Sequence, residues 1–130
     1  MNVLKEMPKI SEAEYEIMKV IWECAPISTN DVVKKFEGQS DWSPKTIQTL
    51  LSRLVKKGAL GYEKHSRVFV YVPLVEENEY LTHESSSFLK KFYNGALNSM
   101  VLNFIEQDKL SDNDINELKK ILESRKKGAK

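Results

Sequence analysis

The sequence predicts a mainly α-helical fold: an N-terminal winged helix-turn-helix with a small β-hairpin wing, followed by a three-helix C-terminal region. Two patterns lead to this fold class. Apolar residues recur at helical spacing in three segments before residue 58, and Pro or Gly ends each segment. Residues 59–72 then change to strand-forming residues on both sides of a short polar turn. Three helices and a hairpin in this order are typical of a winged helix.

The first two helices have recognisable start and end signals. Ser11 and Glu14 fit a capping box, and Pro26 ends the first helix. Ser28 fits the N-cap of the second helix, which Gly38 ends. Cys24 falls on the apolar side of the first helix, where we expect a small core residue.

The third helix is expected between Ser43 and Gly58. Ser43 can cap the free N–H groups, and Pro44 suits the first helical position because its missing N–H would be unpaired there. Gly58 suits a left-handed stop. One apolar stripe would seat the helix on a core; it consists of Ile47, Leu50, Leu51, Leu54 and Val55.

A β-hairpin is expected after Gly58. Residues 59–62 and 68–72 are rich in strand formers, and they flank the polar turn Lys64-His65-Ser66-Arg67. Pro73 closes the hairpin. The wing would therefore have a basic tip.

Positive charge is concentrated on the third helix and the hairpin. The 130-residue chain has a net charge of only +1, but residues 43–73 carry six Lys or Arg against one Glu. Residues 1–42 carry five against eight, and residues 74–130 carry nine against ten. A local basic patch is the expected footprint of nucleic-acid binding even on a nearly neutral chain.

The outward face of the third helix has no carboxylate. A solvated helix face is the alternative interpretation, but such faces usually mix both charge signs. Phosphate contacts are predicted for Ser43, Lys45, Lys56, Lys64 and Arg67, where Ser43 would offer a hydroxyl and the helix N-terminus. Base contacts are predicted for Thr46, Gln48, Thr49 and Arg53: Arg53 suits guanine, Gln48 adenine, and a Thr methyl thymine.

The C-terminal helices expose more apolar surface than three short helices can bury alone. We therefore expect a DNA-binding domain at 1–74 and a helical domain at 75–130 that pairs with a second copy as a two-fold dimer, which in turn predicts an inverted-repeat DNA site. The alternative is a monomer in which these helices fold back onto the winged helix. The predicted interface comprises Leu89, Phe92, Tyr93, Leu97, Met100, Val101, Phe104, Ile105, Leu118, Ile121 and Leu122.

Composition argues against several other classes of protein. Cys24 is alone and the two His are distant, so no disulfide, metal site or cofactor is expected. An enzyme is not expected because His65 and His83 have no visible nucleophile or glycine-rich phosphate loop nearby. No signal peptide or membrane span is visible, which predicts a cytoplasmic protein. A winged helix used only for protein–protein contact would not need the carboxylate-free face.

Four motifs together resemble the BlaI/MecI family of penicillinase and methicillin-resistance repressors, and most closely BlaI of Gram-positive bacteria. They are Trp42-Ser-Pro-Lys-Thr-Ile-Gln-Thr, Arg53-Leu-Val-Lys-Lys-Gly-Ala, Arg67-Val-Phe-Val-Tyr-Val-Pro and Phe92-Tyr-Asn-Gly-Ala-Leu-Asn-Ser-Met-Val-Leu-Asn-Phe. The resemblance runs from about Ile10 to Leu122. Copper-responsive repressors of the same superfamily are the alternative, but they carry paired Cys near the C-terminus, and this chain has none there.

The resemblance implies a dimeric repressor of β-lactamase genes that is inactivated by proteolysis. A membrane sensor acylated by β-lactam would activate its cytosolic zinc protease domain, which cuts an Asn–Phe bond in the family. The matching residues are Asn103 and Phe104. The residues alone do not identify this bond. Without the resemblance, Phe104 would be interpreted as an ordinary core residue and Asn103 as a solvent-facing helix residue.

Overall fold

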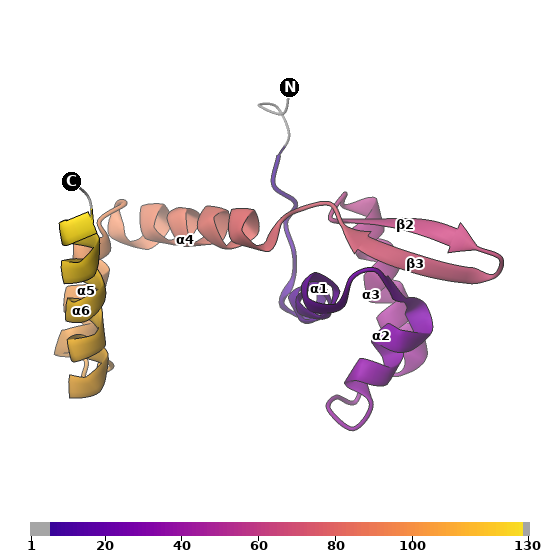
Figure 1. Cartoon of the computed structure of the whole chain (residues 1–130), viewed down its shortest axis with the longest axis horizontal. Helices are drawn as coiled ribbons and strands as arrows, with labels where there is room; N and C mark the ends of the chain where they lie inside the picture. Colours follow the sequence, from indigo (N-terminus) through magenta and orange to yellow (C-terminus); the bar gives the residue numbers. More distant parts are fainter. Residues whose placement is uncertain (1–5, 129–130) are drawn as a thin grey trace. The chain divides into compact units, whose positions relative to one another are not determined.

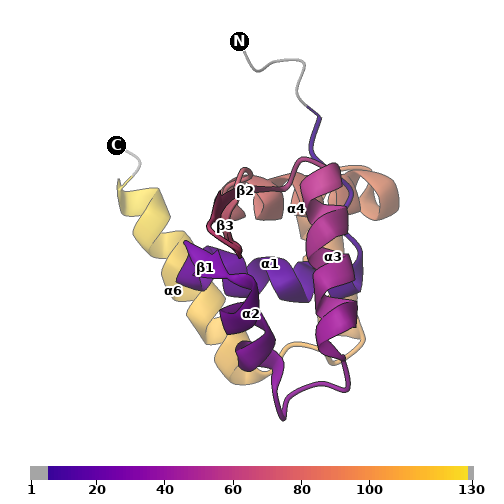
Figure 2. The ribbon, with the colours of Figure 1, turned by 90° about the vertical axis from the view of Figure 1, so that its right-hand side faces the viewer.

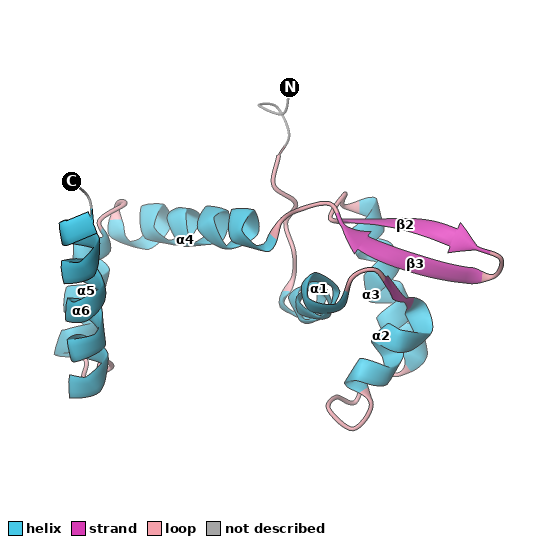
Figure 3. Cartoon of the chain, viewed as in Figure 1, coloured by secondary structure: helices cyan, strands magenta, loops and turns pink. Residues whose placement is uncertain are grey.

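The computed structural model describes residues 6–128 and contains six helices and one three-stranded sheet within that range (Figure 3). The N-terminal elements are α1 (Glu12–Cys24), β1 (Ile27–Ser28), α2 (Thr29–Phe36), α3 (Pro44–Lys56), β2 (Leu60–His65) and β3 (Val68–Pro73). The C-terminal elements are α4 (Glu77–Tyr93), α5 (Leu97–Glu106) and α6 (Asp112–Gly128). The winged-helix fold class predicted from the sequence is confirmed.

The predicted caps are present. Ser11 and Glu14 form a reciprocal capping box at the start of α1, and the Ser28 hydroxyl accepts from the Asp31 N–H at the start of α2. Gly38 and Gly58 follow α2 and α3 with φ of +75° and +83°. These conformations favour glycine, which explains where the two helices stop.

One hydrophobic core holds the N-terminal elements together. In Figure 2, α1 passes behind α2 and α3, and the three helices contact one another. The large hydrophobic side chains that are fully buried come from all three helices and from β2. They are Ile17, Met18, Ile21, Val32, Ile47, Leu51, Leu54 and Leu60. The helical stripes read from the sequence therefore face this core.

The sheet differs from the predicted hairpin in two respects. Its order is β1-β3-β2, because Ile27 and Ser28 pair with Tyr71 and Val70 and add a third strand. The four-residue polar turn was also wrong: Lys64 and His65 belong to β2, and only Ser66 and Arg67 form the turn. Ser66 adopts φ +64°, which allows a two-residue connection. The hairpin of β2 and β3 packs against α1, α2 and α3, and its free end reaches beyond them (Figure 1).

The chain separates into two compact units between His83 and Glu84, within α4. The start of α4 belongs to the first unit because Tyr80 is buried there. Its ring lies 5.9 Å from the rings of Tyr15 and Trp22 in α1, centroid to centroid. Trp22 also donates its indole N–H to the Val75 carbonyl at 2.8 Å. These contacts fix the chain after the wing to α1.

The second unit has no buried side chain among its described residues up to position 126. Asn94 and Gly95, at φ +51° and +81°, form the break between α4 and α5. Ser111 and Asp114 cap α6 reciprocally, at 3.0 and 3.2 Å. The helices thus form locally, while their apolar side chains remain largely exposed.

Candidate nucleic-acid interface

The rotation of α3 is fixed by its buried side. Ser43 accepts a hydrogen bond from the Thr46 N–H at 3.2 Å, and Pro44 occupies the first turn. Ile47, Leu50, Leu51 and Leu54 are buried, with at most 5% of each side chain exposed. The opposite face of α3 must therefore point to solvent.

All nine residues predicted to bind DNA are exposed. Ser43 caps α3, six others lie on α3 itself, and two lie on the wing: Lys45, Thr46, Gln48, Thr49, Arg53, Lys56, Lys64 and Arg67. Within residues 6–128, none of the five cations in this set is paired with a carboxylate. Their charge is therefore available to a polyanion.

Glu63 is the single acidic residue between positions 43 and 73. It directly precedes Lys64 on β2, so the two side chains point to opposite faces of the hairpin. Glu63 contacts His65 on its own face, with 3.1 Å between Oε1 and Nε2. The carboxylate is therefore kept off the face that carries Lys64.

The polar side chains of α3 differ in what they leave free. Thr49 donates its hydroxyl to the Lys45 carbonyl at 3.0 Å, and the hydroxyls of Ser43 and Thr46 lie 3.1 Å apart. Gln48 and Arg53 make no side-chain hydrogen bond within the described part of the chain. Gln48 and Arg53 therefore keep their full set of donors, while Thr49 offers its methyl group and a hydroxyl oxygen that can only accept.

Aromatic packing supports the basic wing. Tyr62 and Phe69 lie edge to face with their centroids 5.2 Å apart, and the Lys64 ammonium lies 5.7 Å from the centre of the Phe69 ring. Lys64 and Phe69 are register partners across the hairpin. The ring therefore limits where the Lys64 side chain can go.

Two grooves join α3 to the wing and include residues that the sequence analysis missed. The first, about 340 Å³, is lined by Thr29, Asn30, Gln48, Ser52, Arg67, Val68, Phe69 and Tyr71. The second, about 250 Å³, is lined by Ser52, Val55, Lys56, Tyr62, Phe69 and Tyr71. Ser52 follows Gln48 by one helical turn, a spacing that could have identified it. Asn30 comes from another helix, and nothing in its local sequence marks it.

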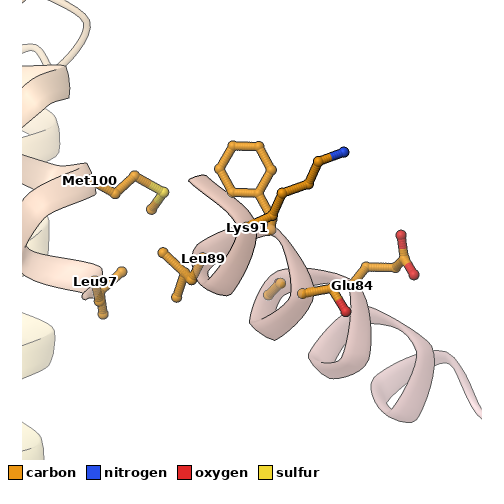
Figure 4. Close-up of a pocket in the computed structure, with 8 residues that line it drawn as sticks. Glu84, Leu89, Lys91, Leu97 and Met100 are labelled. Atoms are coloured by element: carbon orange, nitrogen blue, oxygen red, sulfur yellow. The ribbon is translucent and has the colours of Figure 1, made fainter. Parts of the chain in front are cut away.

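The C-terminal unit presents the predicted pairing residues as exposed or half-buried side chains. Phe92, Leu97, Ile121 and Leu122 are each more than half exposed. A groove of about 610 Å³ lies between α4 and α5, where Leu97 and Met100 point toward Leu89 (Figure 4).

Asn103 and Phe104 lie within α5 and are both exposed. The Asn103 side-chain amide donates to the Tyr93 hydroxyl at 3.2 Å. Ala96, at the N-cap of α5, provides no side-chain hydrogen bond, whereas α1, α2 and α3 all begin with a capping serine. The start of α5 is consequently held less firmly than those of the other three helices.

No group of three or more His, Cys, Asp or Glu is arranged to hold a metal ion within residues 6–128. In the same range, no helix combines the length and apolar character needed to cross a bilayer.

Comparison with known proteins identifies the family. The penicillinase repressor family model matches residues 10–124. The chain belongs to the penicillinase repressor family. The BlaI/MecI resemblance seen in the sequence is thereby confirmed, as is the prediction of a transcriptional repressor rather than an enzyme.

Two relatives cover nearly the whole repressor. The penicillinase repressor of Bacillus licheniformis is 58% identical over 123 residues, which are 95% of this chain and 96% of the relative. The methicillin resistance regulatory protein MecI of Staphylococcus aureus (strain N315) is 45% identical over 114 residues, or 88% and 93% of the two chains.

Two solved structures match the winged helix of the repressor. The DNA-binding domain of the repressor BlaI has 56% identity and a TM-score of 0.53, over 59% of this chain and 94% of that one. The Bacillus licheniformis BlaI monomeric form in complex with the blaP half-operator has 56% identity and a TM-score of 0.51, over 58% and 92%.

Proposed function

We propose that this repressor acts in the cytoplasm as a homodimer that binds inverted-repeat operators of β-lactamase and penicillin-resistance genes. Each copy would place α3 in the major groove and its wing beside it. A membrane β-lactam sensor with a protease domain would relieve repression by cutting between Asn103 and Phe104.

The observation that carries DNA binding is the exposed face of α3. It holds the Gln48 amide, hydroxyls and unpaired cations but no carboxylate, and the core holds this face outward. A duplex offers phosphates at the rim of the major groove and base edges within it, which these groups match. A relative of 56% identity over the same domain was solved in complex with the blaP half-operator, which supports the assignment.

Dimerisation through residues 75–130 is supported by the unburied apolar side chains of α4, α5 and α6. Leu97, Ile121 and Leu122 are 56%, 62% and 66% exposed, and a second copy would cover them. A two-fold dimer presents two α3 helices to two half-sites. Linking two weak modules raises their joint affinity without any new contact to DNA.

Proteolytic inactivation is supported by the position of the expected scissile bond. Asn103 and Phe104 are exposed, and α5 lacks an N-terminal side-chain cap. A protease binds its substrate in extended form, so α5 must open locally first. Cleavage there would separate Phe104 and all of α6 from the rest of the dimer interface.

Binding to the blaP half-operator duplex and to a scrambled duplex of equal length tests the function. We expect the half-operator to bind about a thousandfold more tightly at physiological salt, the low end for specific recognition. Equal affinity for the two duplexes would refute operator recognition by this face. The complete inverted repeat, measured in parallel, reports the contribution of dimerisation.

A further inference from the structure

The groove between α2, α3 and the wing unites polar side chains from three segments that are distant in sequence. Thr29 and Asn30 come from α2, Gln48 and Ser52 from α3, and Arg67 from the turn of the wing. None of the residues that line the groove is acidic, and Arg67 is the single charged one. Asp31 follows Asn30 directly but does not line the groove.

An α-helix with its side chains, about 10–12 Å across, fills the major groove, which is about 12 Å wide. An element that lies beside the inserted helix therefore meets the sugar-phosphate backbone at the edge of the major groove. The start of α2 and the wing occupy such positions, because both line the groove of the protein that Gln48 and Ser52 of α3 also line. A backbone strand over this groove would meet Arg67 from the wing and Asn30 from α2.

We infer that this groove holds one DNA phosphate and that the Asn30 side-chain amide donates a hydrogen bond to it. The inference rests on the proposed function and adds a third element, α2, to the DNA-binding surface. Asn30 is exposed, and its side chain makes no hydrogen bond within residues 6–128, so both amide N–H groups are free. A contact from α2 would fix the angle at which α3 enters the major groove.

An amide contact has a signature distinct from that of a cation. Asn30 carries no charge, so its contact with a phosphate releases no counterion from the DNA. Replacing it should therefore leave the salt dependence of the affinity unchanged. A phosphate contact also carries no base information, so the loss should be equal on specific and scrambled duplexes. Arg67→Ala, by contrast, should reduce the salt slope by about one unit.

The test measures binding of Asn30→Ala to the blaP half-operator duplex, with Asn78→Ala as the matched control. Asn78 is an exposed asparagine of the same unit, between Glu77 and Glu79. We expect Asn30→Ala to bind about five- to tenfold more weakly and Asn78→Ala to bind like the parent. Thermal unfolding of both variants shows whether the fold is retained.

Duplexes in which single phosphates are replaced by neutral methylphosphonates identify the partner. At one position, the replacement should weaken Asn30→Ala about five- to tenfold less than it weakens the parent, because the Asn30 contact is already lost while the Arg67 contact is still removed. Parent-like affinity of Asn30→Ala, additive losses at every phosphate, or a loss confined to one base sequence would each overturn the inference. If the parent itself fails to prefer the half-operator, the proposed function fails instead.

Discussion

Lys57 and Glu14 form an ion pair that joins the end of α3 to the start of α1. The Lys57 ammonium lies 2.6 Å from Oε1 of Glu14 and donates to the Lys9 carbonyl at 2.8 Å. Glu14 is 2% exposed and also accepts the Ser11 N–H as part of the capping box. Although it follows Lys56 directly, Lys57 therefore serves the fold, whereas Lys56 faces solvent.

Replacing Glu14 by Gln should lower the free energy of unfolding by about 1–2 kcal/mol. Gln keeps the size and an acceptor for Ser11 but leaves the Lys57 charge unpaired. Breaking a fully buried ion pair costs more free energy than this. Here the Lys57 side chain is 37% exposed, so solvent screens part of the loss. Glu16→Gln is the control, because Glu16 pairs with Lys19 in solvent. Urea denaturation should show little change for Glu16→Gln; equal losses would contradict the prediction.

Stability should depend on pH through the same carboxylate. Burial raises the pKa of Glu14, but the hydrogen bond and charge of Lys57, together with Ser11, outweigh it and hold the pKa below the ordinary 4.5. The unfolded chain therefore takes up this proton first as pH falls. The contribution of ionised Glu14 to the free energy of unfolding is complete above the ordinary pKa. It is lost as the pH falls through the lowered pKa of the folded protein. The stability difference between the parent and Glu14→Gln should shrink over that window; a constant difference would exclude the mechanism.

Arg53→Ala and Lys56→Ala should weaken DNA binding in different ways. Arg53→Ala should cost about 1–3 kcal/mol on the half-operator and relax sequence preference, because a guanidinium can contact a guanine. Lys56→Ala should weaken all duplexes alike and reduce the salt slope by about one unit. Titrations at two salt concentrations separate the two effects, with Lys19→Ala on α1 as the control. An unchanged slope for Lys56→Ala would remove Lys56 from the phosphate contacts.

Asn103→Asp and Phe104→Ala should reduce β-lactam induction while the uncleaved proteins still bind operator DNA. Both residues flank the bond that the protease would cut, and neither belongs to the winged helix. Ala96→Ser, which supplies a cap to α5, should also slow cleavage, by about fivefold, because opening the helix becomes about 1 kcal/mol more costly. Immunoblots after β-lactam exposure measure cleavage. Parent-like cleavage of Asn103→Asp and Phe104→Ala would place the scissile bond elsewhere.

Local signals predicted much of the fold. Ser11, Ser28 and Ser43 cap the helices expected from the sequence, because a cap depends on residues within one turn. Strand β1 escaped prediction: two residues carry no periodicity, and Ile27 pairs with Tyr71, which lies far along the chain. The predicted turn of the wing was too long, because polar residues such as Lys64 also occur at the exposed end of a strand.

The site was predictable where it lies on one helix. The α3 face follows from spacing alone, because its apolar stripe determines which residues point outward. Asn30 enters the groove only through tertiary packing. The role of Lys57 likewise depends on Glu14, which precedes it by 43 positions. Sequence spacing within one element cannot report such contacts.

Sedimentation of the repressor with a duplex carrying the complete inverted repeat tests the central claim most directly. The claim is that the carboxylate-free α3 face binds operators tightly because the C-terminal helices pair two copies. The parent should sediment as a dimer and place two chains on each duplex. A double variant, Ile121→Asp with Leu122→Asp, should be monomeric and bind the inverted repeat at least about a hundredfold more weakly, with unchanged affinity for a half-site. A monomeric parent that binds the inverted repeat at full strength would contradict the account.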